Sequence, residues 1–185
     1  MSDFWASLHF QDMNNKILIL GFGNPDREDD GVAWHVLTGV AEALGMDTPS
    51  TPDDEFPQAV GQPDFLFMLQ LVPEIAETLA EYDAICFVDA HTGAIEKSVN
   101  VIEIDAQYQN SPFTHHLTPQ SCLELTKTLY GKKPISILVS IRGYQFGFHQ
   151  TLSEGTKQHA KEAIRLILNW LQTGTIDQGT CNQVI

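Results

Sequence analysis

Basic residues are scarce in this chain of 185 residues. Ten Lys and Arg stand against 24 Asp and Glu, which gives a formal net charge of −14 at pH 7. Proteins that bind nucleic acid or anionic membranes use clustered Lys and Arg, because contacts with phosphates release counterions. The composition therefore argues against both partners, and it suits a metal cation or a basic protein segment better.

Cysteines and long apolar runs are also scarce. The three cysteines lie far apart and without CxxC spacing, so we expect no disulfide framework. No apolar run approaches the roughly 20 residues of a membrane helix, and residues 1–15 lack the basic and apolar regions of a signal peptide. We therefore expect a cytoplasmic protein in which Cys86 and Cys122 are small core residues.

The pattern of the chain predicts one domain. We expect a leader at residues 1–15, a single domain at residues 16–172 and a polar C-terminal tail at residues 173–185. Residues 46–64 contain four prolines and several acids without any periodicity, which indicates a long surface loop.

Continuous apolar runs predict strands that helices cover on both faces. In residues 98–105, apolar and polar residues alternate instead, which favours an antiparallel or edge strand. The resulting order, β-α-β-α-β-β-α-β-α, predicts a three-layer α/β sandwich with a mostly parallel sheet of five strands and one antiparallel strand. The predicted strands are 17–21, 65–71, 84–89, 98–105 and 135–141, and the predicted helices begin near 30, 73, 118 and 153.

The first strand leads directly into an acidic loop. The strand breaks at Gly21 and Gly23, and four acids follow between Asp26 and Asp30, interrupted only by Arg27. Open α/β sheets bind their ligands at the carboxyl ends of their strands. Acids crowded at such a place repel one another, and a bound cation would relieve the repulsion.

Other chemistries fit this sequence poorly. A dinucleotide fingerprint requires a third glycine where Asp26 stands, and the acids that follow would repel phosphate. The chain has no GxSxG elbow and no HExxH pair. Neither Cys86 nor Cys122 lies in a loop or at a helix N-terminus, where a reactive thiolate would be expected.

Three strand ends together predict a metal site. Asp29 or Asp30 follows the first strand, Asp89 ends the third, and His115 and His116 precede the helix that begins at Thr118-Pro119. Two carboxylates and one imidazole suit Ni, Zn, Mn or Fe, with coordination positions left open.

Each of these residues also has a simpler explanation. Asp30 could serve only the dipole of the following helix, Asp89 could cap a turn, and His115 could be a surface residue. His91 lies close to Asp89 and could be a ligand or support one. The other histidines are best explained as surface or helix residues. It is the combination at strand ends that favours a site.

The order of these motifs resembles that of the [NiFe]-hydrogenase maturation endopeptidases. The resemblance covers about residues 16–171. It rests on Gly21-Phe-Gly-Asn24-x5-Asp30-Gly31, Phe87-Val-Asp89-Ala, Thr114-His115-His116-Leu-Thr-Pro119 and the late loop Ile141–Phe148.

The resemblance implies a twisted, mostly parallel five-stranded sheet between helix layers. It also implies a peptidase that removes the C-terminal extension of a hydrogenase large-subunit precursor after nickel insertion. By motif position, the catalytic and metal-contacting residues are Asp30, Asp89 and His115. The family often has Glu as the first acid, and Asp30 has a shorter side chain than Glu, so Asp29 is an alternative to Asp30. His116 is likewise an alternative to His115.

The resemblance further implies that the nickel comes with the precursor. We expect no tightly held metal in the isolated protein, which would act as a monomer. Three other functions use the same features: a metal chaperone that cuts nothing, a nucleotide-binding α/β regulator, and a metal-dependent hydrolase of small substrates. The loops at 46–64 and 144–146 are candidates for the choice of partner.

Overall fold

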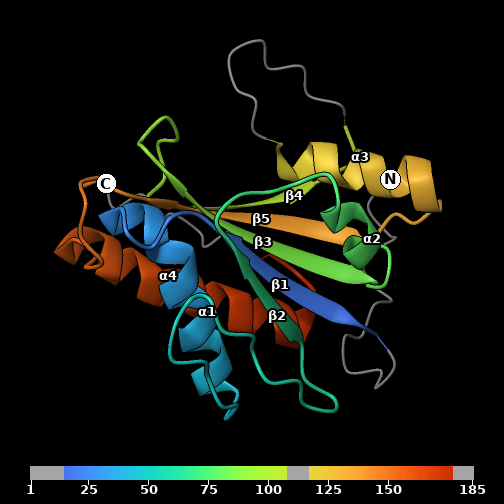
Figure 1. Ribbon diagram of the computed structural model, residues 1–185, viewed down its shortest axis with the longest axis horizontal. Coiled ribbons are helices and arrows are strands. Elements are labelled where there is room, and N and C mark those ends of the chain that lie inside the picture. Colours follow the sequence, from blue (N-terminus) through green and yellow to red (C-terminus); the bar gives the residue numbers. More distant parts are fainter. Residues whose placement is uncertain (1–14, 108–116, 177–185) are drawn as a thin grey trace, which may run out of the picture.

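The computed structural model of the chain describes residues 15–107 and 117–176. A five-stranded sheet lies between two layers of helices (Figure 1). The strands are β1 (Ile17–Phe22), β2 (Asp64–Met68), β3 (Ala84–His91), β4 (Val99–Ile104) and β5 (Ile135–Arg142). The helices are α1 (Val32–Ala43), α2 (Ile75–Leu79), α3 (Pro119–Tyr130) and α4 (Glu154–Thr173), with a short 3-10 helix, η2 (Glu28–Gly31), before α1.

The sheet has the order β2-β1-β3-β5-β4. β1 pairs in parallel with both β2 and β3, and β3 pairs in parallel with β5. β4 is an edge strand and runs antiparallel to β5, as its alternating pattern predicted. The predicted α/β sandwich is confirmed, and the carboxyl ends of β1, β3 and β5 meet at one edge of the sheet.

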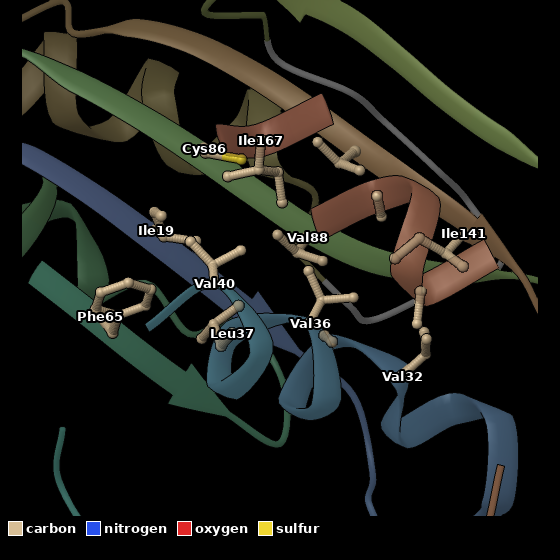
Figure 2. Packing of buried hydrophobic residues seen from close by; sticks show 14 of the residues in the cluster. Ile19, Val32, Val36, Leu37, Val40, Phe65, Cys86, Val88, Ile141 and Ile167 are labelled. Atoms are coloured by element: carbon tan, nitrogen blue, oxygen red, sulfur yellow. The ribbon is translucent and has the colours of Figure 1, made fainter. Parts of the chain in front are cut away.

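Two cores lie on opposite faces of the sheet. α1 and α4 cover one face, where Val36, Leu37 and Val40 of α1 point toward the strands that carry Ile19 and Val88 (Figure 2). α2 and α3 cover the other face. Cys86 and Cys122 are fully buried, one in each core, which confirms the prediction that they are core residues.

Capping residues in the sequence predicted the ends of α3 and the start of α4 correctly. The Thr118 side chain accepts a hydrogen bond from the backbone N–H of Ser121, and Pro119 occupies the first turn. Gly131 ends α3 in the left-handed conformation, with φ of 67°. Ser153 caps α4 in the same way as Thr118 caps α3.

Some predicted boundaries were wrong. The second strand ends at Met68 rather than Leu71, because Leu69 lies beyond the sheet and is 65% exposed. β3 and β5 each continue past the predicted end, because His91 and Arg142 pair in the ladder. The predicted leader and tail lie almost wholly outside the described residues. In the described ranges, no helix is both long enough and apolar enough to cross a bilayer.

Candidate functional site

Three loops meet at the carboxyl edge of the sheet. They are residues 23–31 after β1, residues 92–98 after β3 and residues 143–153 after β5, and they lie toward the left of Figure 1. The edge is where the sequence predicted a site, and the three candidate carboxylates, Asp29, Asp30 and Asp89, lie there.

Asp29 is a buried anchor for two of these loops. One of its carboxylate oxygens accepts hydrogen bonds from the N–H groups of Tyr144 (2.8 Å) and Gln145 (2.9 Å) and from the Ser153 hydroxyl (2.7 Å). The other accepts from the N–H of Ser153 (2.7 Å). Burial alone would raise the pKa of Asp29, but these hydrogen bonds together lower it. A fully buried carboxylate with both oxygens bonded to the protein is poorly suited to bind an incoming metal.

The other acids of the loop have similar structural roles. The Glu28 carboxylate accepts a hydrogen bond from the N–H of Gly147 at 2.6 Å, and the backbone of Glu28 takes a positive φ of 51°. The Asp26 carboxylate accepts one from the Gln150 side chain at 2.7 Å. These bonds fasten the loop to the segment after β5, which sequence reasoning did not pair with it. The sequence predicted that all four acids of the loop repel one another, but Asp26, Glu28 and Asp29 are each stabilised by hydrogen bonds to the segment after β5.

Among the described residues, Asp30 differs from the other three acids because its carboxylate makes no hydrogen bond to the segment after β5. One of its oxygens accepts a hydrogen bond from the backbone N–H of Asn24 at 3.1 Å, and the other accepts none from the described residues. Gly23 makes this turn possible. It has φ of 141°, and a Cβ at this position would collide with the carbonyl oxygen of Asp30. The turn leaves the Asp30 carboxylate with an oxygen available to a ligand.

Asp89 lies near the end of β3, close enough to Asp30 for the two charges to interact. Its carboxylate is partly buried and accepts a hydrogen bond from the N–H of Ala90 at 2.8 Å. Burial raises the pKa of Asp89 to about 7, and the charge of Asp30 adds to the rise against the effect of that bond. Two predicted site residues are thus close enough to repel each other, and a cation between them would relieve the repulsion.

The third predicted ligand is not placed. His115 and His116 lie outside the described residues. Among residues 15–107 and 117–176, no group of three or more His, Cys, Asp or Glu could hold a metal ion. Asp89 shares its sheet face with Ile85 and Phe87, by the alternation of a strand, and α3 covers this face. Asp89 therefore lies on the face that is covered by α3, the helix that directly follows His115 and His116 in the sequence.

His91 lies two residues beyond Asp89 and is held by its own turn. Its Nδ1 accepts a hydrogen bond from the N–H of Gly93 at 3.2 Å. Burial lowers the pKa of His91; the nearby carbonyl groups of Lys97 and Ser98 oppose this, and the charge of Arg142 adds to it. With Nδ1 engaged in the turn, His91 is better placed to support the edge than to bind a metal.

The position of Asp89 predicts an unusual effect on stability. We expect Asp89→Asn to stabilise the metal-free protein by about 1–3 kcal/mol at pH 8. The carboxyl titrates near pH 7 when folded and near 3.9 when unfolded, so the folded state binds the extra proton between these values. The free energy of unfolding of the wild type should therefore fall as the pH rises from about 4 to about 7, and asparagine should remove this fall. Urea unfolding at pH 4 and pH 8 measures it.

Asp83, at the opposite end of the sheet, provides the control. Burial would raise the pKa of Asp83, but its bonds with Lys132 and Lys16 lower it overall. Asp83→Asn should therefore be less stable than the wild type at pH 8. If Asp89→Asn is also less stable than the wild type at pH 8, the prediction that burial and the charge of Asp30 make the Asp89 carboxylate unfavourable is wrong.

Comparisons with known proteins bear on the fold. No family model matches the chain, and no curated protein matches its sequence significantly. Solved structures do match. The [NiFe] hydrogenase maturation protease HycI from Thermococcus kodakarensis KOD1 is 21% identical with a TM-score of 0.58, over 85% of this chain and 92% of that one. The hydrogenase maturating endopeptidase HybD from E. coli is 18% identical with a TM-score of 0.61, over 87% and 94%. The chain shares their fold.

A third structure agrees with these two. An endopeptidase from Escherichia coli, solved in solution, is 18% identical with a TM-score of 0.62, over 87% of this chain and 94% of that one. The matches thus span more than nine tenths of each of the three structures and most of this chain. At these identities the likeness establishes the fold alone, because one fold can carry many different activities.

Proposed function

We propose that the protein is an endopeptidase that removes the C-terminal extension of a [NiFe]-hydrogenase large-subunit precursor after nickel insertion. The observation that carries the proposal is the electrostatic interaction between Asp30 and Asp89 at the carboxyl edge of a fold shared with hydrogenase maturation proteases. The proposal includes a cytoplasmic, monomeric enzyme, as the sequence led us to expect.

Nickel enters this proposal as part of the substrate. The precursor would hold it through cysteine thiolates, and its open coordination positions would accept Asp30, Asp89 and His115, with His116 as the alternative third ligand. Carboxylate oxygens and an imidazole nitrogen are suitable ligands for such an ion. Two carboxylates that repel each other gain most from a cation. A precursor without nickel would therefore bind poorly and escape cleavage.

The residues at the edge also provide for the hydrolytic step. Hydrolysis adds one water to one peptide bond and requires a group that accepts a proton from the water. A carboxylate at the site can act as this general base, and nickel bound to the precursor would supply Lewis-acid polarisation of the carbonyl or of the water. Asp29 is excluded from this role because its oxygens are buried and bonded to Tyr144, Gln145 and Ser153.

Incubation of the purified protein with nickel-loaded and nickel-free precursor tests the proposal. We expect only the loaded precursor to lose the mass of its extension, as measured by mass spectrometry. Asp83→Asn, altered at the far end of the sheet, should cleave like the wild type. Equal cleavage of both precursors would refute nickel recognition. Binding of the loaded precursor without a change in mass would instead favour a metal chaperone.

A further inference from the structure

Among the described residues of this strongly acidic chain, Arg142 has no carboxylate partner. The chain has 24 acidic residues, yet the ion pairs among the described residues all use lysine. The Nε of Arg142 is buried and has no hydrogen-bond partner in the described part of the chain. A buried donor without an acceptor destabilises the folded state, and more so when the group is charged. Such an exception calls for an explanation.

The surroundings of Arg142 hold the side chain but do not neutralise it. Its Cζ lies 5.2 Å from the centre of the Tyr144 ring, a cation–π contact. On another side is Gly93, where an added Cβ would lie 3.3 Å from Nη2 and 3.4 Å from Nε. The backbone is fixed as well, since the N–H of Arg142 donates to the carbonyl of Ser98 and its own carbonyl accepts from the Thr156 hydroxyl.

A second unpaired donor lies directly opposite. His91 pairs with Arg142 in the ladder between β3 and β5. Because Nδ1 of His91 accepts a hydrogen bond from Gly93, the proton of the neutral ring is on Nε2. This Nε2 is also buried and without a hydrogen-bond partner in the described residues. Among the described residues, two neighbouring side chains thus each have a buried N–H group that makes no hydrogen bond of good geometry, although the carbonyl groups of Lys97 and Ser98 lie near the His91 ring.

The register places these donors close to the site. Asp89 pairs with Ser140, and His91 pairs with Arg142 two residues further along the same strands. Two residues of strand correspond to roughly 7 Å. Strand alternation puts all four side chains on one face of the sheet. A peptide with its reacting bond at Asp30 and Asp89 would bring a group one or two residues away to Arg142.

We propose that Arg142 and His91 form a subsite for a carboxylate of the peptide that is cleaved. A guanidinium binds a carboxylate side-on through Nε and one Nη, so the unpaired Nε is one of the two donors this geometry requires. The carboxylate is either the terminal one of the extension or that of an acidic side chain in it. Gly93 leaves space beside the guanidinium, which any side chain would reduce. The subsite rests on the proposed function, but its binding step is tested apart from cleavage.

NMR of 15N-labelled wild-type protein tests binding directly. The signal of the Arg142 Nε–H is assigned by its loss in Arg142→Lys. The probes are three short acetylated peptides: one with a free terminal carboxylate, its terminal amide, and an amide with a single internal glutamate. We expect a saturating shift with one or both carboxylates, which identifies the source, and none with the plain amide. The exposed Arg165 of α4 is the internal control and should not shift. No shift with either carboxylate, or an equal shift with the amide, would overturn the subsite.

Cleavage kinetics provide the second test. Arg142→Lys keeps the positive charge but loses the side-on fork. We expect its KM for the loaded precursor to rise about tenfold with little change in kcat, and Arg165→Lys to match the wild type. A precursor without the identified carboxylate should be cleaved equally by the wild type and Arg142→Lys. A purely structural arginine would lower cleavage of both precursors alike. If the wild type cleaves no precursor, the peptidase proposal fails, and the peptide titration still decides the subsite.

Discussion

Precursor cleavage is expected to fall at least about a hundredfold when Asp30 is replaced by Asn. The amide keeps the size of the side chain and an oxygen that can accept the hydrogen bond from the N–H of Asn24. It loses the negative charge with which the site would bind nickel on the precursor. The fold should therefore survive while the reaction does not. Rates of mass loss with nickel-loaded precursor measure the effect, and thermal unfolding confirms the fold.

Asp26→Asn is the matched control for this prediction. Asp26 lies in the same loop, but its carboxylate is bonded to the exposed side chain of Gln150. The variant should cleave at a rate close to that of the wild type. His115→Ala should behave like Asp30→Asn, and an active His115→Ala would move the third ligand to His116. An Asp30→Asn variant with nearly full activity would contradict the role of Asp30.

Replacement of Asp29, the neighbouring residue, should have the opposite outcome. We expect Asp29→Ala to lower the free energy of unfolding by about 3–5 kcal/mol. It would remove the fully buried acceptor of three partly buried backbone N–H groups, those of Tyr144, Gln145 and Ser153, and would leave the Ser153 hydroxyl with Thr156 alone. Urea unfolding at pH 7 measures the loss. Asp54→Asn, in an exposed loop, should change stability by less than about 0.5 kcal/mol.

The sign of the pH dependence follows from the same contacts. Because the hydrogen bonds lower the pKa of Asp29, its stabilising contribution is complete at neutral pH. It is lost as the pH falls below about 3.9, the value in the unfolded chain, and through the lower folded value. The difference between the wild type and Asp29→Ala should therefore shrink in acid. Equal stability of the two proteins at pH 7 would show that Asp29 does not anchor the loops.

The sequence predicted well those features that depend on neighbouring residues. Thr118 and Ser153 marked the starts of two helices because capping involves backbone groups only three residues away. Continuous apolar runs predicted the buried strands. The alternation at 98–105 predicted the antiparallel edge strand, because the side chains of a strand point to two faces in turn. Asp30 and Asp89 were predicted to approach each other because parallel strands end at one edge.

The sequence could not separate the roles of adjacent acids. Asp29 and Asp30 have the same chemistry and the same local signals, and both were candidates for the metal. The partners that distinguish them come from Tyr144, Gln145 and Ser153, more than a hundred residues further along the chain. The unpaired Nε of Arg142 was equally hidden, since a missing partner is visible only when all neighbours are in place.

By itself, then, the sequence determined the class of fold and the edge of the sheet at which carboxylates gather. These follow from hydrophobic periodicity and from the geometry of parallel strands. Only the tertiary structure decided that Asp29 is hydrogen-bonded to a second loop while the charge of Asp30 acts on Asp89. The reason is physical: the hydrogen bonds and repulsions that give each acid its role depend on contacts between distant segments, which local residue patterns do not specify.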